Sequence, residues 1–461
     1  MSSFLITGGV PLCGSVRVSG SKNAVLPMMA ASILASEPVE LLGVPQLADV
    51  RTLRNLLRHL GVQSRRTADG LSLTTDDAAP IRAPLRLVRR MRASFCVLGP
   101  LLARRGRAVV PLPGGCSIGD RPVDLHLKGL AALGANILVE RGCVVARAAR
   151  LRGATVSMRG PCGPTVTGTA NVLSAAVLAQ GTTTITGAAV EPEIVDLGNF
   201  LNSLGAKIDG LGTPTIRVMG VDELGGGAYR VIPDRIEAAT LLLAVAIAGG
   251  SATVCGVVPE HLAAVFSCLR AAGCVVGQVS NLPVGRVFNS PETSWKLVLR
   301  RLRQVSNLPH DITIAADCPP RPLDVTAEPY PGVPTDVQAQ LTALLCLARG
   351  RSLVRDCVFP GRFLHVAELR RLGASIECRE GAAAIAGVEQ LTGAAVTASD
   401  LRASAALVLA GLAAEGTTRV DHAEHLDRGY QRLDEKLGQL GARIERFDTT
   451  LPRDASASVV E

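Results

Sequence analysis

The sequence predicts an α/β protein of two domains, each made of three similar units with helices inside and sheets facing outward. One observation is a pattern that occurs six times: an apolar helical run, a Gly-rich turn, a short strand and an amphipathic helix ending in Leu-Gly-Ala or a near variant. A second is the length of 461 residues, which exceeds one ordinary core. A third is composition: 48% of residues are apolar but only 3% are aromatic, so Ala, Val, Leu and Ile must build the cores.

Six glycines anchor the repeat, one near the end of each unit. They are Gly61, Gly134, Gly205, Gly273, Gly373 and Gly441. The intervals between them are 73, 71, 68, 100 and 68 residues, so the fourth is longer than the others. That interval contains Gln-Val-Ser-Asn-Leu-Pro twice, at 278–283 and 304–309. We therefore predict that residues 278–309 form an inserted surface segment, with a functional arm as the alternative.

Two uncharged runs, 161–190 and 238–259, have the length of membrane spans but fit the repeat better. Each run is interrupted by glycine, at Gly181 in the first and at Gly249 and Gly250 in the second. A buried small-residue helix, a glycine end and a strand account for both runs. We therefore expect no membrane partner.

The chain is basic, with a formal net charge of +8 at pH 7 and a pI near 9.0. Eight arginines fall between positions 82 and 107, but they alternate with apolar residues as on an amphipathic surface. Aromatic side chains, on which single-stranded nucleic acid stacks, are scarce. We therefore expect small anionic ligands and no nucleic-acid partner, with most of these charges on a solvated face.

Cysteine usage predicts a cytoplasmic protein. Twelve cysteines are scattered singly from Cys13 to Cys378, no Cys-x-x-Cys pair occurs, and no secretory signal opens the chain. This pattern is typical of a reducing compartment, and it predicts neither a disulfide framework nor a metal site.

Cys116 has the most suggestive setting of these cysteines. It lies among three glycines of the segment 112–126, and Arg121 follows it closely. Glycines permit an exposed, flexible loop, and a nearby cation favours the reactive thiolate. A buried and inert cysteine is the alternative.

Several helix starts carry a charged residue. Lys22 follows Ser21, which is placed to cap a helix, and a lysine there would make an anion site or simply be exposed. Arg92 and Arg402 each open an Arg-Ala-Ser sequence, either as two anion-binding helix ends or as a relic of the repeat.

Asp336 also stands at a predicted helix start, where a general base and an ordinary cap are both possible. Two more arginines, Arg362 and Arg428, stand in polar turns.

Taken in order, these segments resemble the enolpyruvyl transferases, in the branch that acts on a sugar nucleotide. The motifs are Ser-Lys-Asn at 21–23, Met-Arg-Ala-Ser at 91–94, the Cys116 loop through Arg-Pro-Val-Asp-Leu-His at 121–126, Pro-Asp-Arg-Ile-Glu at 233–237, Pro-Thr-Asp at 334–336 and Asp-Leu-Arg-Ala-Ser at 400–404. The resemblance covers about residues 4–446 apart from the insertion.

The resemblance implies a two-domain inside-out α/β barrel with pseudo-threefold repeats that closes around its substrates. We expect one domain from residues 1–21 joined with 233–448, a second from 22–232 that carries the cysteine loop, and a disordered tail at 449–461. No cofactor and no metal are implied, and we expect a monomer.

The resemblance also implies a reaction, in which phosphoenolpyruvate gives its enolpyruvyl group to the 3-hydroxyl of UDP-N-acetylglucosamine and phosphate is released. Cys116 would be the proton donor and Asp336 the base, while Lys22, Arg121 and Arg402 would hold phosphoenolpyruvate and Arg428 would close over it. The remaining substrate-binding residues would be Asn23, Arg92, Pro122, Val123, Asp124, Leu125, Thr165, Val166, Val358 and Arg362.

The sequence departs from the family pattern at 159–169. It reads Thr-Val-Thr-Gly-Thr at 165–169 where the family has Ser-Val-Gly-Ala-Thr, and Gly163 stands closest to the position of a family lysine, whose charge Arg159 would replace. Two other functions stay open. Enolpyruvyl transfer to shikimate 3-phosphate shares the fold and the phosphoenolpyruvate chemistry, and the altered segment and the insertion leave room for a non-catalytic protein that binds sugar nucleotides. The Cys116 loop favours the sugar-nucleotide branch over the first, and the presence of Cys116, Asp336 and Arg428 argues against the second.

Overall fold

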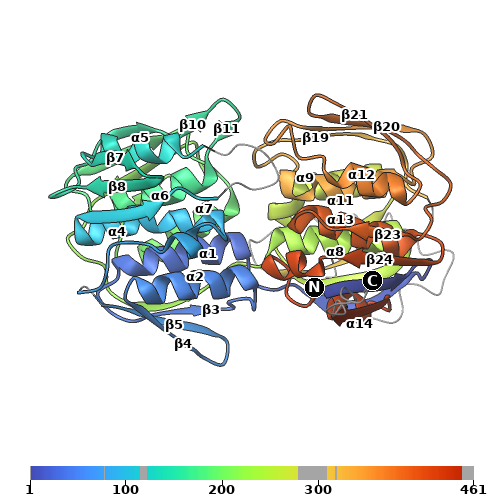
Figure 1. The fold of residues 1–461 in the computed structure, drawn as a ribbon, viewed down its shortest axis with the longest axis horizontal. Helices are drawn as coiled ribbons and strands as arrows, with labels where there is room; N and C mark the ends of the chain where they lie inside the picture. The colour runs from blue at the N-terminus through green and yellow to red at the C-terminus, as the bar shows by residue number, and fades with distance from the viewer. Residues whose placement is uncertain (1, 77, 115–121, 279–308, 317–318, 449–461) are drawn as a thin grey trace, which may run out of the picture.

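A computed structural model of the chain describes residues 2–76, 78–114, 122–278, 309–316 and 319–448. The buried apolar residues form two separate cores. The first lobe is built around buried residues of 24–231, and the second around those of 4–18 and 236–440. The lobes lie side by side along the long axis, and both ends of the described chain belong to the second lobe (Figure 1).

The first lobe holds the following elements, where η marks a 3₁₀ helix. They are α1 (Lys22–Ala31), η1 (Ser32–Leu34), β3 (Val39–Leu42), α2 (Ala48–His59), β4 (Val62–Arg66), β5 (Gly70–Thr75), α3 (Leu85–Val88), η2 (Arg92–Val97), α4 (Leu98–Arg105), β6 (Arg107–Pro111), α5 (Asp124–Ala132), β7 (Asn136–Glu140), β8 (Cys143–Arg147), β9 (Thr155–Ser157), β10 (Arg159–Gly160), β11 (Gly163–Pro164), α6 (Val166–Ala176), β12 (Thr182–Thr186), α7 (Pro192–Ser203), β13 (Lys207–Asp209), β14 (Thr215–Met219) and β15 (Gly227–Arg230).

The second lobe begins with the first two strands of the chain and continues after β15. Its elements are β1 (Ser2–Thr7), β2 (Leu12–Arg17), α8 (Arg235–Ala248), β16 (Gly250–Val257), η3 (Pro259–Leu262), α9 (Ala263–Ala271), β17 (Val275–Gln278), β18 (His310–Ala316), β19 (Asp324–Ala327), η4 (Thr335–Val337), α11 (Gln338–Leu345), β20 (Arg351–Asp356), α12 (His365–Arg371), β21 (Ser375–Arg379), β22 (Ala382–Ala386), β23 (Ala395–Thr397), α13 (Leu401–Ala413), β24 (Thr417–Asp421), η5 (Ala423–Arg428), α14 (Leu433–Gln439) and β25 (Arg443–Asp448).

Six sheets correspond to the six predicted units. The strand orders are β15-β3-β5-β4, β6-β8-β7 and β13-β14-β12-β9 in the first lobe, and β17-β18-β16-β2, β19-β20-β22-β21 and β23-β24-β1-β25 in the second. Each four-stranded sheet has one parallel pair at an edge and is otherwise antiparallel. The three-stranded sheet has a single parallel bridge at the same edge, between Arg82 and Val109, so all six units share one plan.

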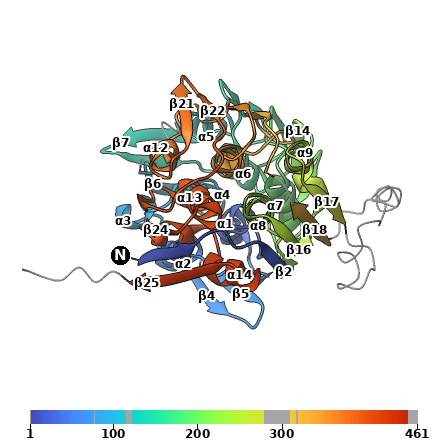
Figure 2. The same ribbon diagram turned by 90° about the vertical axis from the view of Figure 1, so that its right-hand side faces the viewer.

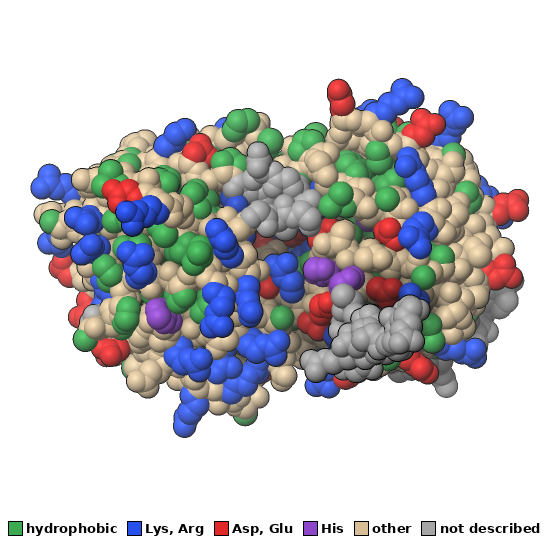
Figure 3. Space-filling view, viewed as in Figure 1, with side chains coloured by type: hydrophobic (Ala, Val, Ile, Leu, Met, Phe, Trp, Pro, Cys, Tyr) green, Lys and Arg blue, Asp and Glu red, His purple; other side chains and the backbone are tan. Residues whose placement is uncertain are grey.

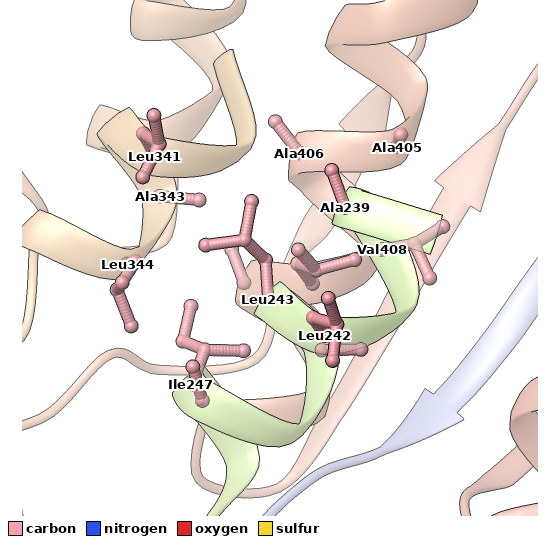
Figure 4. Close-up of a cluster of buried hydrophobic side chains, with 14 of the residues drawn as sticks. Ala239, Leu242, Leu243, Ile247, Leu341, Ala343, Leu344, Ala405, Ala406 and Val408 are labelled. Carbon is pink, nitrogen blue, oxygen red and sulfur yellow. The ribbon is translucent and has the colours of Figure 1, made fainter. Parts of the chain in front are cut away.

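The apolar helix of each unit lies inside its lobe, and the sheets lie at the periphery (Figure 2). In the second lobe α8, α11 and α13 are buried along almost their whole length. Figure 4 shows Leu243 and Ile247 of α8 facing Leu344 of α11, while small residues such as Ala343 and Ala406 let the helix backbones approach. The predicted inside-out α/β fold is therefore confirmed.

The six anchor glycines confirm the repeat at the level of the backbone. Each follows an amphipathic helix (α2, α5, α7, α9, α12 or α14), and all six have positive φ, between 83° and 106°. L side chains rarely adopt this conformation, so glycine is required where the helix ends and the chain turns into the next strand. The uncharged runs likewise contain α6 with β12 and α8 with β16, and in the described part of the chain no helix combines the length and apolarity needed to cross a bilayer.

The predicted insertion joins β17 to β18, which are antiparallel neighbours in one sheet. Residues 279–308 and the predicted tail at 449–461 lie outside the described residues, so both remain predictions.

The chain crosses between the lobes twice, and the two crossings are bonded to each other. Ser21 N–H donates to the Ile232 carbonyl (2.7 Å), and Asp234 N–H donates to the Ser19 carbonyl (2.8 Å). The Asp234 carboxylate accepts from the N–H groups of Ile236 (2.8 Å) and Glu237 (3.0 Å), which caps α8. It also accepts from the N–H of Lys22 (3.0 Å) at the start of α1, so one side chain binds helix ends in both lobes.

A buried ion pair supports the same region from the second lobe. Lys436 Nζ lies 2.7 Å from Glu237 Oε1 and 2.7 Å from Ser19 Oγ, and Ser19 N–H donates to the other oxygen of Glu237 (2.6 Å). Burial raises the pKa of Glu237, and the Lys436 charge opposes that shift. The pair therefore ties α14 to α8 and to the first crossing.

We predict that Lys436→Met lowers the free energy of unfolding by about 3–5 kcal/mol, because it leaves the Glu237 carboxylate buried without its cation. Urea unfolding would measure this loss, which should shrink as the pH falls toward the ordinary pKa of glutamic acid, since protonated Glu237 carries no charge. Lys207→Met, at an exposed lysine of β13, is the matched control and should change stability by less than about 0.5 kcal/mol. Equal stability of the two variants would show that the buried pair contributes nothing.

Candidate functional site

A cavity of about 320 Å³ lies at the junction of the lobes. The first lobe lines it with residues near the starts of α1, α2, η2 and α6, and the second with residues before α13 and within η5. The lining residues are Lys22, Asn23, Leu26, Asp49, Arg89, Arg90, Met91, Arg92, Ala93, Gly114, Thr167, Ser399, Asp400, His425 and Arg428. On the face shown in Figure 3, Lys and Arg side chains gather over the first lobe and reach the junction. Cations and helix N-termini together favour an anionic ligand.

Lys22 begins α1, and Ser21 caps that helix as predicted, with its hydroxyl accepting from Ala24 N–H (3.3 Å). Lys22 Nζ lies 2.7 Å from Asp49 Oδ2, and Arg428 Nε lies 3.1 Å from Asp49 Oδ1. Asp49 thus holds one cation from each lobe. Burial lowers the pKa of Lys22, the Asp49 carboxylate opposes that shift, and the charges of Arg402 and Arg428 add to it.

Asp336 lies in η4 between two arginines of its own lobe. Its Oδ1 is 2.9 Å from Arg362 Nη2 and its Oδ2 is 3.3 Å from Arg402 Nη2. No side-chain hydrogen bond caps η4 or α11, so the carboxylate serves the arginines rather than a helix end. Burial would raise the pKa of Asp336, but the guanidinium groups of Arg402 and Arg362 hold it well below its usual value. Asn23 Nδ2, 3.5 Å from Oδ2, connects this cluster to α1 and so to the cavity.

The two Arg-Ala-Ser sequences start helices of different kinds. Arg402 lies in the first turn of α13, where the Asp400 carboxylate accepts from its N–H (2.8 Å) and from Ala403 N–H (3.2 Å). Arg92 begins the 3₁₀ helix η2, which leads into α4, and its Nη2 donates to the Pro122 carbonyl (3.1 Å). Both arginines are therefore placed at helix starts, but only α13 has a side-chain cap.

The segment after Pro122 is anchored by a buried histidine. Val123 and Leu125 pack against the first-lobe core, and Asp124 begins α5. Next to them, His126 Nε2 lies 3.2 Å from Thr167 Oγ1, and its Nδ1 lies 3.1 Å from Asn171 Nδ2. Burial lowers the pKa of His126 to about 3, so the ring is neutral at physiological pH and serves to attach α5 to α6.

Thr165 caps α6 by accepting from Gly168 N–H (3.3 Å), and Val166, the first residue of the helix, is exposed. Of this segment only Thr167 lines the cavity. Gly163 has φ +98°, a conformation that L side chains rarely adopt, so a lysine at this position would be strained in this backbone. Arg159 is exposed on β10 and does not line the cavity, so the structure offers no support for its replacing that charge.

Val358 and Arg362 follow β20 in the second lobe. Val358 N–H donates to Asp356 Oδ1 (2.9 Å), and Thr335 Oγ1 donates to the other oxygen of Asp356 (2.5 Å). Arg362 Nη1 donates to Thr335 Oγ1 (3.2 Å), so this turn is joined to the backbone that carries Asp336.

The structure brings together part of the predicted site. Lys22, Asn23, Arg92 and Arg428 line one cavity, and Asn23 joins them to the Asp336 cluster. Ten predicted residues do not line this cavity: Pro122, Val123, Asp124, Leu125, Thr165, Val166, Asp336, Val358, Arg362 and Arg402. Cys116 and Arg121 lie outside the described residues.

Sequence reasoning missed several residues of the cavity. They are Asp49, Arg89, Arg90, Asp400 and His425. Asp49 and Asp400 stand at helix starts, where an acidic residue is ordinary, and the two arginines belong to the stretch that we interpreted as a solvated face. Among the described residues no cluster of His, Cys, Asp or Glu has the composition to hold a metal ion.

Comparisons with known proteins agree with this geometry. A family model described as EPSP synthase (3-phosphoshikimate 1-carboxyvinyltransferase) matches residues 6–437. The enolpyruvyl transferase NikO from Streptomyces tendae superposes with a TM-score of 0.81 at 26% identity, covering 96% of this chain and 98% of that one. An EPSP synthase from Acinetobacter baumannii, at 18% identity, shares the fold with a TM-score of 0.69, covering 97% and 100%. The chain is therefore an enzyme of the enolpyruvyl transferase class.

More similar relatives narrow the assignment. UDP-N-acetylglucosamine 1-carboxyvinyltransferases from Anaeromyxobacter sp. and Akkermansia muciniphila are 50% and 46% identical over 451 and 448 residues, which is 97% of this chain and 99% of each relative. The chain belongs to this family.

We predict that Asp49→Asn lowers the pKa of Lys22 further, because it removes the carboxylate that opposes the effect of burial. Acetylation of Lys22 by acetic anhydride, followed by mass spectrometry across a pH series, should then reach its midpoint at a lower pH than in the parent protein. Asp69→Asn, which breaks the exposed pair with Arg230 (2.6 Å), should leave that midpoint unchanged. An unchanged or higher midpoint in Asp49→Asn would contradict the assigned electrostatics.

Proposed function

We propose that this enzyme transfers the enolpyruvyl group of phosphoenolpyruvate to the 3-hydroxyl of UDP-N-acetylglucosamine, with release of phosphate, as the first committed step of peptidoglycan synthesis. The observation that carries the proposal is the meeting of Lys22, Arg92 and Arg428 in one cavity next to the Asp336 cluster. The family of the chain and its relatives at 46–50% identity support the choice of substrates.

The charge of the site suits this chemistry. Both substrates are polyanions, and Lys22 and Arg428 reach the cavity from different lobes. Fixed guanidinium and ammonium groups stabilise charge that develops on a carboxyvinyl phosphate in the transition state. Closure of the lobes around bound substrates would exclude water and strengthen these contacts.

The reaction that we propose is an addition followed by an elimination. The sugar oxygen bonds to C2 of phosphoenolpyruvate and gives its proton to Asp336, while the Cys116 thiol protonates C3 and becomes a thiolate. In the elimination the thiolate takes a proton back from C3, the bond from C2 to the phosphate oxygen breaks, and phosphate leaves with the proton that Asp336 had received. Lys22, Arg121 and Arg402 would hold the phosphate and carboxylate, and Arg428 would close over them.

The low pKa of Asp336 bears directly on its role as base. A carboxylate held well below its usual pKa by two arginines is a weak proton acceptor. A substrate anion beside Arg402 would counter part of that positive charge and so raise the pKa of Asp336. The base would then become effective in the complex in which it is needed.

The uridine part of the acceptor would contact Arg121 and residues 122–125, with Thr165, Val166, Val358 and Arg362 further out. Cys116 and Arg121 enter this proposal on the resemblance alone, because both lie outside the described residues. Gly114, the last described residue before them, lines the cavity. As a step of peptidoglycan synthesis, the proposed reaction would take place in the cytoplasm. Its loss would affect cell shape and cell division.

We predict that the protein releases phosphate from phosphoenolpyruvate with UDP-N-acetylglucosamine as acceptor and not with shikimate 3-phosphate. A colorimetric phosphate assay with each acceptor measures this. Release with shikimate 3-phosphate alone would favour the sister activity, and release with neither would overturn both enzyme assignments.

We also predict that Cys116→Ala abolishes proton transfer to C3 and covalent labelling by fosfomycin, because both need the thiol. Mass spectrometry of the treated protein and solvent deuterium incorporation at C3 are the measurements. Cys162→Ala, at an exposed thiol of the described chain, is the control and should be labelled like the parent protein. Labelling of Cys116→Ala would place the reactive thiol elsewhere.

A further inference from the structure

Arg402, the central cation of the proposed site, lies against an aromatic ring. Its guanidinium carbon is 5.4 Å from the centre of the Tyr430 ring, and the Arg402 side chain is only 4% exposed. Tyr430 is itself buried and lies two residues beyond Arg428, the last residue of η5. A cation over a ring face is attracted to it most strongly where water is excluded.

The hydroxyl of Tyr430 is held by two polar residues of the inner helices. It lies 2.9 Å from Thr240 Oγ1 on α8 and 3.2 Å from Gln340 Nε2 on α11. The Thr240 hydroxyl donates its proton to the Ile236 carbonyl (2.8 Å), so Tyr430 must donate to Thr240. Burial raises the pKa of Tyr430, which agrees with a protonated hydroxyl.

The same amide reaches the backbone of the proposed base. Gln340 Nε2 donates one N–H to the Asp336 carbonyl (3.1 Å). Its other N–H faces the Thr240 and Tyr430 hydroxyl oxygens, at 3.1 Å and 3.2 Å from the nitrogen. Asp336 and Arg402 form an ion pair at 3.3 Å, and the network contacts both of them. Gln340 contacts the backbone carbonyl of Asp336, and the Tyr430 ring contacts the guanidinium of Arg402. All three side chains of the network are buried, next to a core that is built mainly from apolar side chains.

We propose that Tyr430, together with Thr240 and Gln340, is a positioning residue of the reaction: it fixes the plane of the Arg402 guanidinium relative to Asp336 and to the anionic group of phosphoenolpyruvate. This proposal rests on the proposed function, which makes that anion a substrate. If the network only stabilised the fold, its loss would affect the KM values of both substrates alike. If it positions Arg402, its loss should affect mainly the KM for phosphoenolpyruvate.

Two variants separate the ring from the hydroxyl. Tyr430→Phe keeps the ring under Arg402 and removes the hydroxyl, and Tyr430→Leu removes both. Tyr229→Phe is the matched control, because the Tyr229 hydroxyl donates to Asp196 Oδ1 (2.7 Å) within the first lobe and does not line the cavity. Urea unfolding of all three variants measures their loss of stability.

Steady-state phosphate release with each substrate varied in turn is the test. Tyr430→Phe should raise the KM for phosphoenolpyruvate by about fivefold to tenfold, as for one lost hydrogen bond, and leave the KM for UDP-N-acetylglucosamine within about twofold. Tyr430→Leu should in addition lower kcat by about 10²-fold, because the guanidinium is no longer held in place. Tyr229→Phe should change neither KM.

Equal changes in both KM values, or parent kinetics in Tyr430→Phe, would overturn the proposal while leaving the proposed function intact. If the parent protein releases no phosphate with either acceptor, the proposed function fails, and calorimetric titration with inorganic phosphate replaces the kinetic test. Weaker phosphate binding by Tyr430→Phe than by the parent and by Tyr229→Phe would then support positioning of Arg402, and equal binding by all three would overturn it.

Discussion

The relation between the two lobes depends on one carboxylate at the point where the chain crosses between them. Asp234 accepts hydrogen bonds from the first N–H groups of α8 and from the N–H of Lys22 at the start of α1. Because helix starts carry unpaired donors and a positive dipole end, one anion can satisfy two of them at once. The same residue therefore stabilises a helix in each lobe and positions Lys22 at the junction where the cavity lies.

Carboxylates shared between cations recur around the cavity. Asp49 lies between Lys22 and Arg428, and Asp336 lies between Arg362 and Arg402. Several cations crowded into a partly buried space would repel one another, and each carboxylate offsets part of that repulsion while orienting two side chains. The network of Tyr430 adds a neutral support on the second-lobe side, so Arg402 is held both by charge and by a ring.

Local patterns predicted the fold well because each can be read over a short stretch. The glycine that ends each amphipathic helix, the capping Ser21 and the small-residue helices all depend on neighbours in the chain. The partners of the site depend on the packing of distant segments: Asp49 and Arg428 are 379 positions apart, and nothing in either segment indicates the contact. Gly163 is an intermediate case, because its positive φ depends on the pairing of β10 with β11, which the sequence of this segment does not indicate.

The position of Arg428 would give the proposed closure of the lobes a physical basis. It comes from the second lobe but contacts a carboxylate of the first, so the Asp49 pair already links the lobes through charge. A phosphate in the cavity would give Lys22 and Arg428 a common anionic partner and would add to the attraction between the lobes. A ligand shifts a conformational equilibrium only by its difference in affinity for the two states. Substrate would favour a closed arrangement if it binds as proposed, because Lys22 and Arg428 line the cavity from different lobes.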